Sequence, residues 1–226
     1  MNEQTVVQAL HVGQPRSMGT PGAPDPMERP WTSAIIKQPV DGPVYLSKTG
    51  LAGDGVADQK NHGGPEKAVL AYPFAHYATW REELDRFDIP VGAFGENFLV
   101  TDMKEEAVCI GDTYRVGEAT VQVSQPRQPC WKPARRMRIK DLVLRMQETG
   151  RTGWYFRVLK EGEVKAGQVL QLVERPFPKW TIARCNEIQY HRPHDHQAAA
   201  ELAACPLLSQ SWAEGLARRA HRGNGV

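Results

Sequence analysis

Cys130 is the side chain whose surroundings most clearly suit chemistry. It lies in residues 124–132, Ser-Gln-Pro-Arg-Gln-Pro-Cys-Trp-Lys, directly after a strand-like run. Because proline cannot continue a β ladder, we expect the thiol to lie on a loop. Arg127 and Lys132 flank it, and cationic neighbours lower a thiol's pKa from about 8.5 toward neutrality, which favours the thiolate that acts as nucleophile or metal ligand. The alternative is a small buried hydrophobic residue, the usual role of a free cysteine. The basic, proline-framed setting favours chemistry.

Three glycine-rich segments could contribute to the same site. Residues 53–68 contain Gly-Asp-Gly-Val-Ala-Asp and His-Gly-Gly-Pro-Glu-Lys-Ala; glycine lets backbone N–H groups approach an anion, and Lys67 adds a point charge suited to phosphate. Residues 92–98 place Glu96 and Asn97 at the start of a strand, where a carboxylate and an amide can hold a polar group. Residues 150–157 bring Arg157 onto a strand, and an arginine with a lysine makes an anion site. Each segment alone could be an ordinary turn. Together they have the groups that an anionic, metal-bearing cofactor needs.

Composition excludes several classes of protein. The chain has 226 residues, 41% hydrophobic and 24% charged, which is ordinary for a globular protein long enough to bury a core. Its net charge of +2 gives no global field for nucleic acid. No apolar run is long enough to span a bilayer, and residues 1–5 lack the features of a signal peptide. We therefore expect a cytoplasmic protein that binds neither membranes nor nucleic acid.

The cysteines are too scattered for a zinc knuckle or a redox motif. A reducing cytosol also argues against disulfides. Cys109 lies in an apolar, strand-like run, and Cys185 and Cys205 lie in helical patterns. We predict that these three are core residues and that Cys130 is the exception.

The first three quarters of the chain read as short strands separated by turns, which favours a barrel or sandwich. A turn at residues 41–43 predicts a hairpin between the strands 35–40 and 44–47. Residues 13–30 read as a Gly/Pro-rich loop without periodicity. The predicted strands are 5–12, 35–40, 44–47, 97–100, 107–110, 113–116, 119–124, 155–159 and 168–174.

Helices are predicted in two regions. Within the barrel, residues 74–87 carry an apolar stripe of Tyr77, Trp80, Leu84 and Phe87, and residues 140–149 end at Gly150 as a C-cap. After residue 176 the pattern becomes helical, so we divide the chain into a barrel domain, 1–176, and a three-helix segment, 177–226. The predicted caps of its helices are Thr181, Asp195 and the Ser211/Glu214 capping box. His191, His194 and His196 cluster at its first loop; helix capping and solvent exposure explain them as well as a metal would.

The chemical motifs, taken in order, resemble those of the MOSC domain family. They are Gly53-Asp54, His62-Gly63-Gly64-x-x-Lys67-Ala68, Gly95-Glu96-Asn97-Phe98, Ser124-Gln125-Pro126-Arg127-x-Pro129-Cys130-x-Lys132 and Gly153-Trp154-x-x-Arg157. The chain most resembles the YiiM-like branch, whose members add a three-helix C-terminal segment. The resemblance covers nearly the whole chain, apart from the 13–30 insertion. It implies a mainly β fold with helices, a MOSC-type β-barrel carrying a C-terminal three-helix appendage.

The resemblance also implies an activity. Members of the family bind the molybdenum cofactor (molybdopterin), and YiiM-like proteins are associated with reduction of N-hydroxylated compounds such as hydroxylaminopurine bases, with amidoximes as a related class. Cys130 matches the loop cysteine that ligates molybdenum in amidoxime-reducing relatives, and a soft thiolate suits such a metal. The residues expected to contact the cofactor are Lys67, Glu96, Gln125, Arg127, Lys132 and Arg157, and the expected catalytic residues are Asp54, His62, Asn97 and Cys130.

Partners and alternatives follow from the same reasoning. Electrons would come from a separate protein that carries a flavin or an iron–sulfur cluster. A homodimer would be an ordinary assembly for such a chain. One alternative is a sulfur carrier that holds a persulfide on Cys130 for metal–sulfur cluster assembly. Another is a non-catalytic module that binds a phosphorylated ligand through the same basic pocket.

Overall fold

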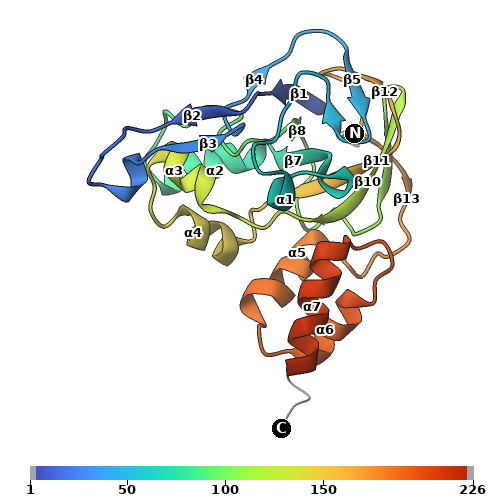
Figure 1. The fold of residues 1–226 in the computed structure, drawn as a ribbon. Coiled ribbons are helices and arrows are strands. Elements are labelled where there is room, and N and C mark those ends of the chain that lie inside the picture. The colour runs from blue at the N-terminus through green and yellow to red at the C-terminus, as the bar shows by residue number, and fades with distance from the viewer. Residues whose placement is uncertain (1–3, 223–226) are drawn as a thin grey trace.

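The computed structural model describes residues 4–222, and its centre is a closed β structure with helices on two sides (Figure 1). The strands are β1 (Val7–Val12), β2 (Arg16–Met18), β3 (Trp31–Ser33), β4 (Gln38–Pro39), β5 (Val44–Ser47), β6 (Gly50–Leu51), β7 (Val69–Pro73), β8 (Phe98–Val100), β9 (Thr113–Val116), β10 (Ala119–Pro126), β11 (Trp154–Lys160), β12 (Gly162–Val164) and β13 (Gln171–Glu174). The helices are α1 (Gln59–His62), α2 (Ala75–Glu83), α3 (Trp131–Met137), α4 (Leu142–Thr149), α5 (Ile182–Asn186), α6 (His196–Ala203) and α7 (Gln210–Arg222), with 3-10 turns at Pro26–Glu28 and Pro65–Lys67 and a π-helix at Glu187–His191. None of these helices is long and apolar enough to cross a membrane.

The main sheet curls round so that one of its edges reaches the start of β1. Its order is β13-β9-β10-β11-β7-β8-β1-β4, antiparallel throughout except for the parallel pair β7–β8. An isolated bridge joins Val6 to Val169, and the Val7 N–H donates to the Gln168 carbonyl at 2.9 Å. The chain before β13 is thereby joined to the start of β1. The predicted barrel with a C-terminal helical appendage is confirmed.

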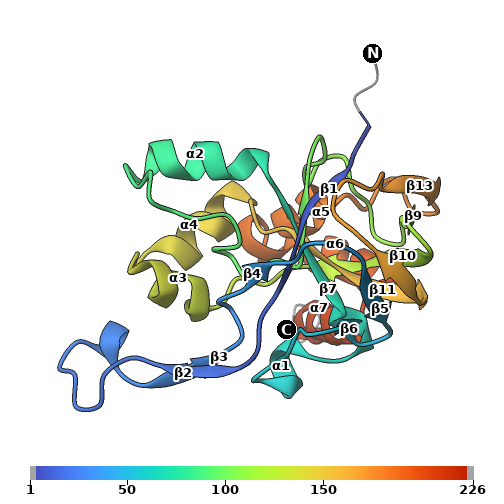
Figure 2. The same cartoon turned by 90° about the horizontal axis from the view of Figure 1, so that it is seen from above.

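Two apolar clusters fill the fold. The larger lies inside the barrel and continues into the C-terminal helices, so that Phe98 and Val121 share a core with Ile182 and Leu202. The smaller lies beneath α2, α3 and α4, where Tyr72, Trp80 and Phe94 pack with Met137 and Met146 of the helices. Figure 2 shows α2, α3 and α4 grouped on one side of the barrel. The second cluster fixes the helix that begins beside Cys130.

The three-helix segment packs directly on the barrel. Backbone hydrogen bonds link Ile182 N to the Val108 carbonyl at 2.7 Å and Ser209 N to the Ser124 carbonyl at 2.8 Å. Thr181 and Asp195 cap their helices as predicted, accepting from backbone N–H groups three residues later. The capping residue of α7 is Ser209, whose hydroxyl accepts from Trp212 N, rather than Ser211. The predicted division at residue 176 stays a prediction.

Four sequence-based assignments are wrong. No hairpin joins residues 35–40 to 44–47: β4 pairs with β1, while β5 pairs with β6 and β12. Residues 107–110 make only an isolated bridge from Cys109 to Thr181. Residues 13–30 are not an irregular loop, because β2 pairs with β3 to form a projecting two-stranded ribbon (Figure 2). Within helix α2, Phe87 was assigned to the buried stripe but lies beyond the helix and is 71% exposed.

Candidate functional site

Most of the predicted site residues line one cavity of about 320 Å³. Its walls come from the base of the ribbon, the loop around α1, the start of β7 and the segment after β10. Such a volume falls at the lower end of the range typical of small-molecule sites. The predicted residues that line it are Asp54, His62, Lys67, Asn97, Arg127, Cys130 and Lys132.

Cys130 lies at the start of a helix instead of within a loop. It is the N-cap of α3, and its thiol is half-buried. Burial raises the pKa of Cys130, but a hydrogen bond from His62, the charge of Arg127 and the Lys132 backbone N–H outweigh it and lower that pKa to about 7. The thiol of Cys130 therefore ionises more readily than that of an ordinary cysteine. The other three cysteines are buried, as predicted, and burial raises the pKa of each.

His62 connects the thiol to a carboxylate that we did not predict. Asp58 caps α1 by accepting from Asn61 N, and its Oδ2 lies 3.2 Å from His62 Nδ1. Lys132 Nζ lies 3.4 Å from the same nitrogen. Since Nδ1 faces these two groups, Nε2 is the nitrogen left to donate to the thiolate. Nδ1 accepts from Lys132 when the imidazole is neutral, and donates to Asp58 when it is protonated.

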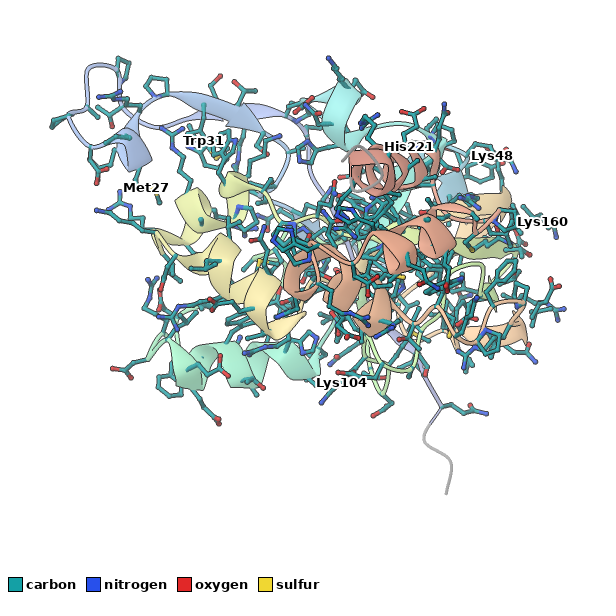
Figure 3. All side chains as sticks on the ribbon, turned by 90° about the horizontal axis from the view of Figure 1, so that it is seen from below. Met27, Trp31, Lys48, Lys104, Lys160 and His221 are labelled. Atoms are coloured by element: carbon teal, nitrogen blue, oxygen red, sulfur yellow. The ribbon has the colours of Figure 1, made fainter. Side chains whose placement is uncertain are left out.

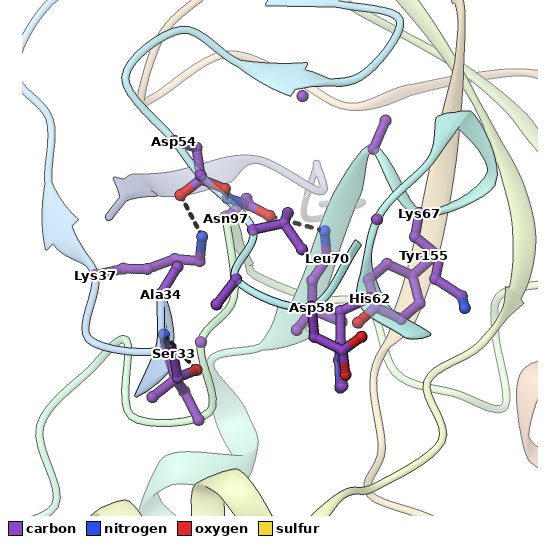
Figure 4. Close-up of a pocket in the computed structure, with 18 of the residues that line it drawn as sticks. Ser33, Ala34, Lys37, Asp54, Asp58, His62, Lys67, Leu70, Asn97 and Tyr155 are labelled. Atoms are coloured by element: carbon purple, nitrogen blue, oxygen red, sulfur yellow. Dashed lines mark hydrogen bonds and ion pairs between the residues drawn. The ribbon is translucent and has the colours of Figure 1, made fainter. Parts of the chain in front are cut away.

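A second polar group lies apart from His62, Asp58 and Lys67 (Figure 4). Lys37 pairs with Asp54 Oδ1, which also accepts from Gly13 N at 2.8 Å. Asn97 Nδ2 donates to Asp54 Oδ2 at 2.8 Å, and its Oδ1 accepts from Leu70 N at 3.1 Å. Burial lowers the pKa of Lys37 although Asp54 opposes the shift. Asp54 and Asn97 thus hold a buried lysine in the cavity wall.

The cavity has the charge and the free donors that an anionic cofactor needs. Four cations line it, Lys37, Lys67, Arg127 and Lys132, against the carboxylates of Asp54 and Asp58. Arg127 is only 4% exposed; its Nη2 donates to the Phe94 carbonyl at 3.1 Å, while Nη1 has no partner among the described residues. A buried guanidinium nitrogen without a partner is costly. A soft thiolate suits a metal such as molybdenum, and a free guanidinium nitrogen suits the phosphate of its pterin. The residues present therefore fit the molybdenum cofactor.

Three predicted cofactor contacts lie outside this cavity. Arg157 forms an ion pair with Glu66 at 2.9 Å and donates to the Leu207 carbonyl at 3.0 Å. Glu96 is fully buried, where it accepts from the Tyr77 hydroxyl and from Gly92 N. The Gln125 side chain donates to the Pro126 carbonyl at 3.2 Å and accepts from the Ser211 hydroxyl at 3.4 Å. In this structure these three side chains hold segments of the chain together.

The residues that sequence reasoning missed are Lys37 and Asp58. Lys37 sits in a segment that we assigned to a regular strand, and only its pairing with Asp54 across the cavity marks it. Asp58 had a readable signal: it precedes His62 by four residues, one turn of a helix, and aspartate is a preferred N-cap. The Gly-Trp pair of the last motif also has a structural role. Gly153 has a φ of +72°, and a Cβ there would lie 2.3 Å from the Ala71 carbonyl oxygen.

The pH dependence of alkylation gives a direct test of the thiolate. We expect iodoacetamide to label Cys130 of the cofactor-free protein at a rate that rises with pH around a midpoint near 7, because the thiolate is the reactive form. In His62→Ala the midpoint should move toward about 8.5, the value of an ordinary thiol. Cys130→Ser is the control, since its remaining cysteines are buried. A wild-type midpoint near that of a free thiol would contradict the assignment.

Two family models match this chain. The MOSC domain model matches residues 58–171, and the model described as "YiiM-like, 3-alpha helix domain" matches residues 180–222. The chain is 41% identical to YflK of Bacillus subtilis (strain 168) over 220 residues, 97% of this chain and 96% of that protein. It is 42% identical over 181 residues to a protein named "Reductase" from Gibberella moniliformis, covering 78% of this chain but 32% of that protein. The crystal structure of YiiM from Geobacillus stearothermophilus superposes with a TM-score of 0.79 at 38% identity, covering 96% of this chain and 99% of that one.

Proposed function

Because the chain belongs to the MOSC domain family, in the YiiM-like branch that carries the three-helix domain, we propose that it is a molybdenum-cofactor-dependent reductase of N-hydroxylated compounds. The substrates would be hydroxylaminopurine-type bases, with amidoximes as a second class. The observation that carries this proposal is the half-buried Cys130 thiol, with its pKa lowered by His62 and Arg127, in a net-positive cavity where Arg127 Nη1 has no partner among the described residues. MOSC domains are generally associated with the molybdenum cofactor, and a relative is named a reductase.

Different residues of the cavity would hold different parts of the cofactor. Cys130 would be the metal ligand, and His62 would orient its sulfur. Lys67, Arg127 and Lys132 would hold the pterin phosphate through charge-assisted hydrogen bonds. When bound, the cofactor supplies a centre that passes two electrons to an N–O bond.

The protein would supply protons for the same reaction. Converting an N-hydroxyl group to an N–H group takes two electrons and two protons and releases one water. Lys37 is a charged donor held by Asp54 in the cavity wall, and burial lowers its pKa, which makes its proton easier to give. Lys37 is therefore our candidate to hand a proton to the departing oxygen, and solvent would restore it.

The reducing equivalents would come from another protein. The chain matches about a third of the Gibberella moniliformis reductase, so most of that relative lies outside the shared part. We propose an external donor with a flavin or an iron–sulfur cluster. A homodimer and a cytoplasmic location stay predictions.

Metal content and activity together test this proposal. Protein made in cells that synthesise the molybdenum cofactor should contain close to one molybdenum per chain. It should reduce 6-N-hydroxylaminopurine to adenine with reduced methyl viologen as electron source. Metal-free protein with cyanide-releasable sulfur on Cys130 would instead support the sulfur carrier. Protein with neither would support a non-catalytic module.

Replacing Lys67 should weaken cofactor retention more than stability. We expect Lys67→Ala to lower cofactor affinity about 10- to 100-fold, because a hydrogen bond to a charged group contributes about 1.5–3 kcal/mol. Its thermal midpoint should stay close to wild type, since partly exposed cations add little to stability. Molybdenum per chain after gel filtration measures the loss. Lys160→Ala, an exposed lysine on β11, is the control; equal retention in both variants would contradict the role of Lys67.

A further inference from the structure

Positive charge is concentrated in the stretch that contains Cys130. Residues 127–145 hold seven Lys and Arg against the single carboxylate of Asp141, whereas the whole chain holds 28 against 26. The rest of the sequence is therefore net negative. Arg127 and Lys132 line the cavity, but Arg135, Arg136 and Arg138 belong to α3 and its C-cap, on the side covered by the ribbon.

The ribbon and α3 join through arginine and tryptophan. The Arg135 guanidinium lies over both the Trp31 ring, at 5.6 Å, and the Trp131 ring, at 5.3 Å. Its Nε donates to the Met27 carbonyl at 2.9 Å, and its Nη2 donates to the Arg29 carbonyl. The two tryptophans meet edge to face with centroids 5.4 Å apart. Figure 3 shows Met27 and Trp31 on the ribbon beside these helices. This stack holds the ribbon in one position.

The charges on this surface are mostly not neutralised. Arg135 and Arg136 donate to backbone carbonyls, which carry no net charge. Burial lowers the pKa of Arg136, the nearby Glu96 carboxylate opposes that shift, and Arg16, which is exposed on the ribbon, lowers the pKa further. Arg138 meets Glu28 at 3.4 Å. We call this surface the basic ribbon face, made of Arg16, Arg29, Trp31, Trp131, Arg135, Arg136 and Arg138.

The basic ribbon face has the composition of a binding surface. Trp131 is 49% exposed although it is a large aromatic side chain. Arginine and tryptophan are the residues most enriched at interface hot spots. Arg135, Arg136 and Arg138 line a hollow of about 220 Å³ together with Trp31 and Glu28. Because the stack is already assembled, little side-chain entropy would be lost on binding.

The position of this face points to one kind of partner. Trp131 follows Cys130 in the chain and is the first residue of α3. A donor seated over Trp131 would thus lie beside the proposed metal ligand. We propose that the basic ribbon face docks an acidic electron-donor protein, which delivers its electrons toward Cys130 over Trp131. This rests on the proposed reductase function. For each N–O bond broken, the donor is oxidised by two electrons and solvent supplies two protons.

Electron-transfer complexes are small and short-lived, and complementary charge mainly raises their association rate. This argues for a protein donor over nucleic acid, whose binding needs many phosphate contacts at once.

The test compares two electron sources on the cofactor-loaded full chain. Reduced flavodoxin, a small acidic flavoprotein, is the protein donor, and reduced methyl viologen is the small donor that needs no docking. The ribbon variant is Arg16→Glu with Arg29→Glu. The matched control is Lys160→Glu with Lys165→Glu, which changes the net charge equally; Lys160 lies at the opposite end of the molecule from Trp31 (Figure 3).

We expect the ribbon variant to lower kcat/KM for flavodoxin at least 10-fold at low salt. Its rate with methyl viologen should stay within twofold of the wild-type rate. The wild-type flavodoxin rate should fall as salt rises, because salt screens exposed charges. Equal losses in ribbon and control variants, or a loss below twofold in the ribbon variant, would overturn the proposal while leaving the reductase function standing. If the wild-type protein reduced the substrate with neither flavodoxin nor methyl viologen, the reductase function itself would be overturned. If the ribbon variant lost binding to a duplex DNA oligonucleotide and kept its flavodoxin rate, the face would belong to nucleic acid and the proposal would fall.

Discussion

Cys130→Ser is expected to abolish molybdenum-dependent reduction while leaving the fold intact. A serine hydroxyl does not ionise near neutral pH and is a poor ligand for a soft metal. Replacing residues that only orient metal ligands typically costs 10- to 100-fold, so losing the ligand itself should cost more than about 100-fold. The structure explains why the fold would survive: Cys130 is half-buried at the N-cap of α3, and serine is a better N-cap than cysteine. Molybdenum per chain, initial rate and thermal midpoint measure the three effects.

Cys109→Ser provides the contrasting control. Cys109 is buried and lies 3.6 Å from the Pro178 carbonyl, at the junction of barrel and helices. A hydroxyl there should cost about 1–3 kcal/mol of stability and leave the rate per folded molecule unchanged. If Cys130→Ser kept its metal and the wild-type rate, Cys130 could not be the ligand, whatever Cys109→Ser showed.

Removing the chain after Pro178 should prevent the barrel from folding as a soluble monomer. Ile182, Ile188, Leu202 and Leu216 are nearly or fully buried in the same cluster as the barrel interior. Burying one such side chain is worth about 1.5–3 kcal/mol, so these four alone approach the whole stability of a typical domain, about 5–15 kcal/mol.

The truncation would also expose hydrogen-bonding groups of the barrel. Ile110 N would lose the Trp180 carbonyl, and the Ser124 carbonyl would lose Ser209 N. Gel filtration and circular dichroism measure the outcome, which we expect to be aggregation. Two single substitutions give intermediate and control cases for the loss of stability. Leu216→Ala should cost about 2–5 kcal/mol, whereas Phe87→Ala changes an exposed position and should cost little. A monomeric truncated protein with a cooperative melt would show that the barrel folds independently of the helices.

The sequence was most informative where one residue type has one physical meaning. The proline-rich run after β10 and its thiol led to Cys130, and Asp195 predicted its helix start because capping is local. Strands with both faces buried were harder to predict from the sequence. All five residues of β7 are buried, so no alternation marked it as a strand.

The cofactor contacts divide for a similar reason. Lys67 and Arg127 lie on segments that immediately adjoin the cavity, and the glycine and thiol motifs pointed to them. Arg157 looked equally suited, but Glu66 and Leu207, distant in the chain, take its guanidinium. A charged side chain shows its type in the sequence, and only the fold decides which partner it meets. Helix α3 was not predicted; Pro133 is compatible with it because proline is well tolerated in the first turn of a helix.

The closure of the barrel also has a consequence for how the chain folds. The bridge between Val6 and Val169 joins segments about 160 residues apart, and such distant pairings form late because loop closure must come first. During synthesis, β1 has neither its β8 partner nor its closing partner until most of the barrel sequence has left the ribosome. The helices that complete the core come later still. The nascent protein should therefore expose apolar barrel surface until translation ends, which makes it a natural client for chaperones that hold unfinished chains.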